Sequence, residues 1–282
     1  MKRKKVITMI AAALAFTMTV CGSSTAIAAS ELTAESKPAT QYTIDANQEV
    51  YALLDFEDTT EFENATKGLL ASPDTLDICD ENGKVVWSQT AYAFLDQDAP
   101  DTANPSLWRD TQLNHIYGLF EVTDGIYQVR GYDMSNVTFI KGDTGWIVVD
   151  PLMSVECAQA AFALVEENLG IFPVKAVIYS HSHVDHFGGV KGIVSEEEVQ
   201  AGNVQVIAPE GFEKHAVSEN IYAGTAMGRR ASYQYGTMLE GGETGSLAIG
   251  IGMGQSKGRT SYISPTLRRG WHRPLQRFIH QM

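Results

Sequence analysis

Three of the seven histidines stand within six residues of one another, in the run His181-Ser182-His183-Val184-Asp185-His186. Neutral imidazole and carboxylate are the ligands that Zn²⁺ and similar divalent cations prefer. His181 and His183 are two residues apart, so in an extended loop both side chains can face one cation. Asp185 and His186 are adjacent and point in different directions, which favours a second cation beside the first. Two such cations can share a water molecule and make it reactive near neutral pH.

The segments on either side must position this run. The apolar, β-branched segment 174–179 comes directly before it and predicts a buried strand. Gly188 and Gly189 follow it, and without a Cβ the backbone there can turn sharply and approach other groups closely. The histidines therefore fall where a strand gives way to a loop, which is where open α/β sheets usually place a site. The alternative, three surface histidines beside a solvated aspartate, fits this combination less well.

Patterns elsewhere predict an α/β (α+β) fold. Alternation and β-branched runs predict strands at 85–87, 92–95, 126–129, 137–140, 146–150 and 204–207. Helices are expected from Ser154 to Gly170, after Ser195 with Glu198 as its capping-box partner, and from Phe212 to about Tyr235. Strands that give way to strand–helix alternation fit the first part of an αββα sandwich.

Several motifs together resemble one family. The metal run before Gly-Gly resembles the signature of the metallo-β-lactamase superfamily. Within that superfamily, the segments 104–109, 118–122, 128–133, 150–152, 180–190, 207–209, 216–220 and 229–233 are similar to the linear alkylsulfatases, which hydrolyse sodium dodecyl sulfate. The resemblance extends from about residue 40 to about residue 266. It implies an αββα sandwich, a site for two zinc ions and the hydrolysis of alkyl sulfate esters to alcohol and sulfate.

By this resemblance, His181, His183, Asp185 and His186 are four of the zinc ligands. Asp185 is also the expected catalytic residue, because it could hold the proton of the attacking water. The family completes its site with acidic residues and another histidine farther along the chain. Glu219 is a conceivable ligand, or a residue that holds a ligand from behind, although a capping or solvated carboxylate fits its predicted helix better.

Other side chains have weaker claims to the site. Tyr132, Asp133, Arg229 and Arg230 are candidates to line it, and Met227, Met238 and Met253 could line a tunnel for an alkyl chain. A structural role is at least as good an interpretation for each. The later histidines are His215, in a predicted helix, and His272 and His280 near the end of the chain.

The end of the chain changes character. No aspartate follows Asp185, the last acidic residue is Glu243, and residues 267–282 are basic and do not resemble the family. We expect a frameshift or premature stop near residue 266; the alternative is a genuine basic tail. The family's helical dimerisation domain and sterol-carrier-like domain then have no counterpart here. Four ligands leave about two for each of two ions, below the usual four, so weak metal binding is expected. The missing half would also cover apolar faces of this half, so we expect poor solubility or dependence on a partner.

The N-terminus predicts export. Residues 1–28 combine a basic start, an apolar run and a small-residue cleavage site, as secretory signal peptides do, and indicate a periplasmic or extracellular protein. Cys21 offers a lipoprotein anchor as a second possibility. No other apolar run is long enough to cross a bilayer. The expected organisation is a signal peptide at 1–28, a leader and irregular N-terminal segment at 29–112, disordered up to about residue 50, a partial catalytic domain at 113–266, and the basic tail at 267–282.

Composition limits the partners. The net charge of −13 argues against nucleic acid and anionic membrane surfaces. The expected partner is a small alkyl sulfate substrate; a homodimer is implied only for intact members of the family. Cys79 and Cys157 are too few for a disulfide framework, and Cys157 lies on the apolar stripe of a predicted helix. Two alternatives stay open: hydrolysis of a thioester, lactone, β-lactam or phosphodiester at the same metals, or a non-catalytic fragment.

Overall fold

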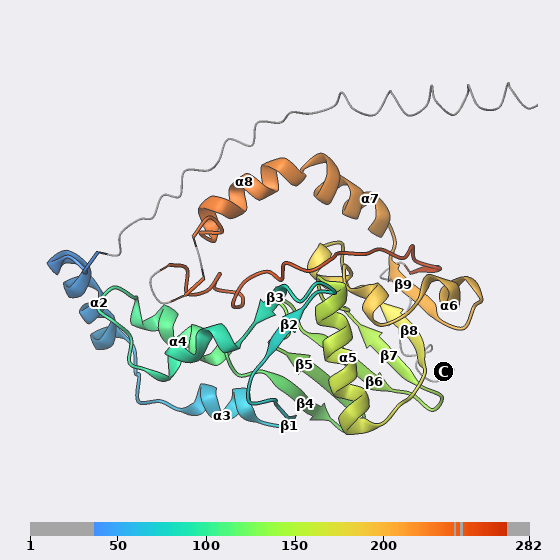
Figure 1. Cartoon of the computed structure of the whole chain (residues 1–282), viewed down its shortest axis with the longest axis horizontal. Helices are drawn as coiled ribbons and strands as arrows, with labels where there is room; N and C mark the ends of the chain where they lie inside the picture. The colour runs from blue at the N-terminus through green and yellow to red at the C-terminus, as the bar shows by residue number, and fades with distance from the viewer. Residues whose placement is uncertain (1–36, 240, 243–244, 270–282) are drawn as a thin grey trace, which may run out of the picture. The chain divides into compact units, whose positions relative to one another are not determined.

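The computed structural model describes residues 37–239, 241–242 and 245–269 (Figure 1). The predicted signal peptide, His272, His280 and most of the predicted basic tail lie outside these residues. All the elements below belong to one unit that begins at Pro38. No helix in the described ranges combines the length and apolar character needed to cross a membrane.

The main sheet has eight strands in the order β1-β4-β5-β6-β7-β8-β9-β10. Their bounds are Leu69–Ala71 (β1), Gly118–Thr123 (β4), Ile126–Arg130 (β5), Val137–Lys141 (β6), Trp146–Val149 (β7), Val174–Ile178 (β8), Gln205–Pro209 (β9) and Leu267–Arg269 (β10). β1 and β4 to β7 pair antiparallel, whereas β7, β8, β9 and β10 run parallel. The strands predicted at 126–129, 137–140, 146–150, 174–179 and 204–207 are therefore confirmed, with small shifts of their ends.

The parallel pair β7 and β8 decides where the site lies. Val149 at the end of β7 is in register with Ile178 at the end of β8. Both strands therefore release their following loops at the same edge of the sheet. One loop begins with Asp150 and the other carries the histidine run. Figure 1 shows these two loops emerging at the same edge.

Helix α5 (Val155–Leu169) connects β7 to β8 and packs on one face of the sheet. Its buried side chains Cys157, Ala158, Ala161 and Val165 meet Val148 and Val177 of the sheet. This confirms Cys157 as a core residue. On the opposite face, a smaller buried cluster of Ile147, Ala176 and Ile207 follows the same strands. Because β7 and β8 are buried on both faces of the sheet, their sequences are nearly continuous apolar runs.

The segment before residue 113 is more regular than expected. It contains the helices α2 (Gln41–Leu53), α3 (Thr60–Thr66) and α4 (Pro105–Asn114), the 3₁₀ helix η1 (Thr90–Asp96), and the small sheet of β2 (Asp77–Cys79) and β3 (Val85–Ser88). The prediction of a disordered leader up to residue 50 is wrong over α2, where the Thr40 side chain caps the first turn. The strand predicted at 92–95 is also wrong, because these residues form η1; the strand predicted at 85–87 is β3.

The chain after β9 forms an arm and then returns across the sheet. The arm consists of α7 (Phe212–Val217), a π-helical turn η4 (Ser218–Tyr222) and α8 (Gly224–Gln234). The short elements η2 (Val184–His186), η3 (Val190–Gly192) and α6 (Glu196–Gln200) lie between β8 and β9, and Ser195 and Glu198 form the predicted capping box of α6. The single helix predicted from Phe212 to Tyr235 is thus three pieces. β10 shows that the first three residues of the predicted basic tail continue the sheet.

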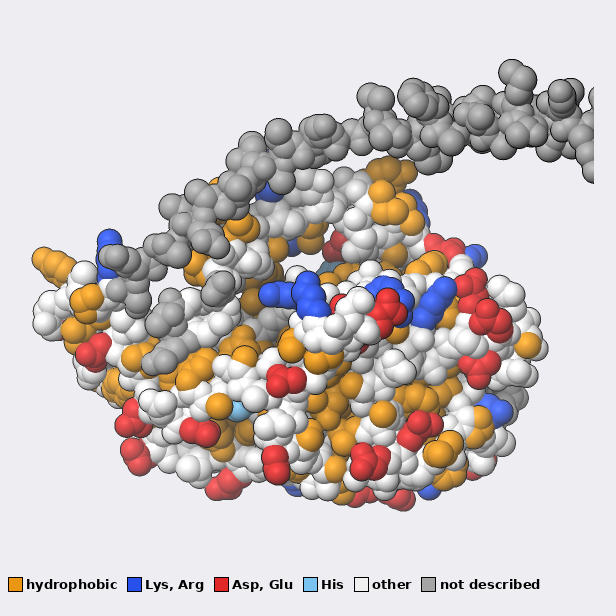
Figure 2. Space-filling model, viewed as in Figure 1, with side chains coloured by type: hydrophobic (Ala, Val, Ile, Leu, Met, Phe, Trp, Pro, Cys, Tyr) orange, Lys and Arg blue, Asp and Glu red, His pale blue; other side chains and the backbone are white. Residues whose placement is uncertain are grey.

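The surface of the arm is unusually apolar. Ile221, Tyr222 and Tyr233 are between 69% and 94% exposed, and Met238 just beyond α8 is 83% exposed. Figure 2 shows orange side chains on this arm, whereas Asp and Glu side chains are scattered over the lower part of the same view. Only α7 is anchored in the core, through the buried residues Phe212 and Ala216. An exposed apolar surface of this kind favours contact with other apolar groups, and the poor solubility expected from the sequence stays a prediction.

Candidate metal centre

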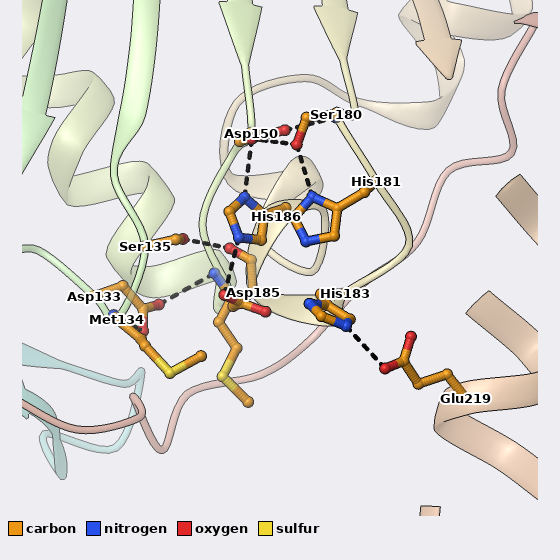
Figure 3. Close-up of polar contacts among 11 residues, drawn as sticks. Asp133, Met134, Ser135, Asp150, Ser180, His181, His183, Asp185, His186 and Glu219 are labelled. Carbon is orange, nitrogen blue, oxygen red and sulfur yellow. Dashed lines mark hydrogen bonds and ion pairs between the residues drawn. The ribbon is translucent and has the colours of Figure 1, made fainter. Parts of the chain in front are cut away.

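Asp150 organises the edge of the sheet where the histidine run emerges. Its carboxylate accepts hydrogen bonds from the Ser180 backbone N–H at 2.8 Å and from the Ser180 hydroxyl at 2.6 Å. Its Oδ2 also lies 2.9 Å from Nδ1 of His186 (Figure 3). Asp150 itself has a positive φ of 56°. Aspartate is one of the few residues that tolerate this conformation, which turns the chain sharply off β7.

His186 is held between two carboxylates. Nδ1 meets Asp150, and Nε2 lies 3.1 Å from Oδ2 of Asp185. Burial alone would lower the pKa of His186, but the hydrogen bonds and charges of the two carboxylates outweigh it and raise the pKa to about 9. In the metal-free protein, both ring nitrogens therefore carry protons at neutral pH. A cation that binds Nε2 must replace one of those protons.

Asp185 is ready to bind a cation. Burial alone would raise its pKa, but the hydrogen bond and charge of His186 bring the pKa below its ordinary value, so the carboxylate is ionised. The hydroxyl of Ser135, from the loop after β5, donates to the backbone carbonyl of Asp185. The loop that carries the predicted ligands is thereby tied to a second loop of the sheet.

His181 faces the same point as His186. The centroids of the His181 and His186 rings are 4.2 Å apart, and those of His181 and His183 are 4.6 Å apart. The Ser180 hydroxyl gives its only proton to Asp150, so at 2.9 Å it accepts one from Nδ1 of His181. This tautomer leaves the lone pair on Nε2. Burial, followed by the neighbouring imidazoles, lowers the pKa of His181, which favours the neutral form that binds metal ions.

The chemical type and the orientation of these side chains suit a divalent cation. Three imidazoles and one carboxylate lie close together on a single loop, and Asp150 supplies the carboxylate partner that metal-binding histidines usually have on the outer nitrogen. They do not yet form a closed coordination site: across the described ranges, no group of three or more His, Cys, Asp or Glu side chains is arranged to hold a metal ion. Nε2 of His186 is paired with Asp185 and carries a proton. The donor set fits zinc once that proton leaves.

The two glycines after the run explain how the loop fits. A Cβ on Gly188 would lie 2.3 Å from the carbonyl oxygen of Met153, and one on Gly189 would lie 2.2 Å from that of Pro151. The loop of residues 181–189 (the metal loop) therefore packs backbone to backbone against the segment that leads into α5. Ser261 closes the loop from the other side, because its N–H and hydroxyl both donate to the Gly188 carbonyl. The prediction of a close backbone approach at this point is confirmed.

Asp133 has a structural position near the site. Its buried carboxylate accepts from the backbone N–H groups of Met134, Met153 and Ser154 and from both donors of Ser256. It joins the loop after β5, the start of α5 and the returning chain. Ser154 does begin α5, but its side chain makes no capping bond. Asp133 therefore supports the loops around the metal run from inside the core.

The other candidates are spread through the molecule. Tyr132 and Met253 are buried in the core, which favours the packing interpretation. Arg229 and Arg230 are exposed on α8, and neither forms an ion pair among the residues that the structure describes. Met238 and His215 are exposed as well. None of these side chains contacts the metal loop in a described interaction.

Two residues of the site were not assigned from the sequence. Asp150 and Ser180 were quoted only as parts of family motifs, yet they hold His186 and His181. The signal available was a polar residue at the carboxyl end of each of two adjacent parallel strands. Glu219 was considered both as a ligand and as a residue behind a ligand; the structure places its Oε1 2.9 Å from Nε2 of His183.

The model of the metallo-beta-lactamase superfamily matches residues 130–271. The chain belongs to this superfamily. The match begins at the end of β5 and takes in the metal loop, the arm and β10.

Sulfatases are similar over a longer stretch. A "Linear primary-alkylsulfatase" from Pseudomonas sp is 50% identical over 233 residues, which are 82% of this chain and 35% of that protein. The "Alkyl/aryl-sulfatase BDS1" of Saccharomyces cerevisiae is 48% identical over 226 residues, 80% of this chain and 35% of that protein. An "(R)-specific secondary-alkylsulfatase" from Pseudomonas sp is 51% identical over 218 residues. The resemblance to alkylsulfatases is confirmed, and the chain spans about a third of the length of these relatives.

A solved structure agrees with the fold. The stereoselective inverting sec-alkylsulfatase Pisa1 from Pseudomonas sp. superposes with a TM-score of 0.79 at 48% identity, covering 83% of this chain and 37% of that one. The fold of this chain is thus similar to one part of that longer chain.

Proposed function

We propose that the protein hydrolyses alkyl sulfate esters to alcohol and sulfate at a zinc site that includes His181, His183, Asp185 and His186. The observation that carries the proposal is the convergence of these donors on one loop, within a chain about 50% identical to proteins named alkylsulfatases. The superfamily is typically zinc-dependent. Two ions are proposed for the complete site, to which these four residues contribute part of the ligand set.

The residues around the ligands have defined tasks. Asp150 orients His186, and through Ser180 it sets the tautomer of His181, so that both imidazoles turn Nε2 inwards. Bound zinc supplies Lewis acidity, which polarises the ester and makes water more acidic. Asp185 is a ligand that also holds a proton of the attacking water. The hydroxyl of Ser135 holds the backbone of Asp185 in place while the Asp185 carboxylate holds this proton.

Sulfate release from dodecyl sulfate tests the proposal. The full chain is loaded with zinc, and sulfate release is measured beside a chelated sample and a variant carrying both His181→Ala and His183→Ala. We expect turnover that depends on zinc and falls at least 100-fold in the variant. Turnover of a thioester, lactone, β-lactam or phosphodiester without sulfate release would favour the other hydrolase chemistry. Equal metal content and turnover in the double variant would contradict the proposed site.

We also propose that the protein is exported. The support is the basic start and apolar run of residues 1–28. Fractionation of cells that express the full chain would place it in the periplasm or medium with residues 1–28 removed. A membrane-bound form that is released when Cys21 is replaced by serine would favour the lipoprotein instead. Small-molecule alkyl sulfates are the proposed partners.

A further inference from the structure

His183 differs from the other two histidines of the loop in the ring nitrogen that is hydrogen-bonded and in the part of the chain that supplies its partner. His181 and His186 bond outward through Nδ1, to Ser180 and Asp150 at the edge of the sheet. His183 bonds through Nε2, to Glu219 in the arm. Figure 3 shows the two nitrogens of His183 turned opposite ways: one meets Glu219, and the other faces the side where Asp185 lies.

The π-helical turn places Glu219 there. The N–H of Ala223 bonds to the carbonyl of Ser218, five residues back, which widens this turn of the arm. A widened turn shifts the side chains that follow α7 out of the ordinary helical register, and such turns often occur at functional sites. Ile221 and Tyr222 in the same turn are exposed to solvent, whereas the Glu219 side chain is only 26% exposed and reaches the metal loop.

We propose that Glu219 is a positioning residue of the metal centre: by accepting a hydrogen bond from Nε2 of His183, it presents Nδ1 of that imidazole to the cation. This inference rests on the proposed zinc site. A carboxylate on the outer nitrogen fixes the tautomer and orientation of a metal-binding imidazole and increases its basicity. Glu219 would thus do for His183 what Asp150 does for His186.

The arrangement links the arm to the metal. α7 is anchored by Phe212, whose ring lies 5.2 Å from that of Tyr179 and 5.4 Å from that of Phe187. Glu213 adds a second attachment, because it accepts from Ser264 and Tyr262 and pairs with Arg268. Among the residues that the structure describes, the pair of Glu219 and His183 forms the polar contact between η4 and the metal loop. The ordering of His183 therefore depends on where the arm lies.

Zinc titration of the full chain and three variants tests this. Compared with the wild type, we expect roughly 10–100-fold weaker zinc binding in Glu219→Ala and a smaller loss in Glu219→Gln, whose amide oxygen still accepts the hydrogen bond. Glu213→Gln is the matched control, since it alters the same arm without touching the metal loop. Its zinc affinity should stay within about threefold of the wild type. Thermal unfolding without metal separates loss of folding from loss of affinity.

NMR of the imidazole N–H protons supplies a measurement that would not change if Glu219 had only a general packing role. In the zinc-loaded chain, His183 should show Nε2–H protected from exchange, identified by its absence in His183→Asn. Glu219→Gln should keep the signal but shift it, and Glu219→Ala should lose the protection. Unchanged affinity and protection in Glu219→Ala would overturn the inference while leaving the zinc site intact. An equal loss in Glu213→Gln would overturn it too. Failure of the wild type to bind zinc would overturn both this inference and the proposed function.

Discussion

Oδ2 of Asp150 lies 2.9 Å from Nδ1 of His186, although 36 residues separate them. The parallel pairing of β7 and β8 brings them together, because both strands end at the same edge. The same carboxylate holds Ser180, the residue before His181. Asp150 thus orients two of the predicted ligands at once.

Removing the charge of Asp150 should weaken metal binding more than folding. We expect Asp150→Asn to reduce zinc affinity roughly 10–100-fold, since the histidines lose their charged partner. Asparagine tolerates the positive φ of this position, so the thermal midpoint should change little. Asp150→Val is the contrasting variant, because a β-branched residue is strained at that φ and should lower the midpoint as well. Equal zinc affinity in the wild type and Asp150→Asn would contradict the assignment.

The close packing of the metal loop predicts a penalty at Gly189. An added Cβ would meet two carbonyl oxygens and the side chain of Ala158, all closer than 3 Å. Gly189→Ala should therefore lower the free energy of unfolding by about 1–3 kcal/mol, as overpacking does. Gly224→Ala is the control, because a Cβ there meets nothing within 4 Å. Urea unfolding of the two variants checks the difference, and a loss of the same size at Gly224 would count against close packing as the cause.

The two described cysteines should react at very different rates. Cys79 is exposed, whereas Cys157 is buried in α5, and burial raises the pKa of its thiol, with the nearby Asp133 adding to the effect. A thiol reagent should label Cys79 within the native protein and reach Cys157 only on unfolding. Mass spectrometry of labelled peptides, with Cys79→Ser as control, checks this. Labelling of Cys157 at the rate of Cys79 would show that α5 opens.

Asp133 should make stability depend on pH. Burial raises its pKa in the folded chain, although its hydrogen bonds oppose the shift. Because the pKa of Asp133 is higher in the folded chain than in the unfolded chain, protonation of its carboxyl stabilises the fold. This contribution to the free energy of unfolding is complete below the ordinary pKa of about 4 and is lost as pH rises through the folded pKa. The free energy of unfolding of the wild type, relative to Asp133→Asn, should therefore fall as pH rises from about 4. Each unit of raised pKa corresponds to about 1.4 kcal/mol.

Urea unfolding at a series of pH values measures the difference in the free energy of unfolding between the wild type and Asp133→Asn. The test depends only on the slope of this difference against pH. The amide group of the variant faces backbone N–H donors and changes stability by a constant amount. A difference that rises with pH above 4 would mean that the five hydrogen bonds of Asp133 lower its pKa, against the expectation.

Local patterns predicted the regular elements well where one interaction dominates. The capping box of Ser195 and Glu198 lies within one turn and formed as predicted. Residues 92–95 looked like a strand, yet Tyr92 and Phe94 pack ring against ring in η1, with centroids 5.7 Å apart. No feature of so short an apolar run distinguishes these outcomes, because packing with distant residues decides between them.

The sequence by itself determined which candidate ligands are neighbours along the chain: spacing alone brings His181, His183, Asp185 and His186 into one loop, and their chemistry predicts a divalent cation. Only the tertiary structure decided their partners, Asp150 from a parallel strand and Glu219 from a π-helical turn. The physical reason is that strand pairing and helix packing act between segments far apart in sequence, so no spacing along the chain records them.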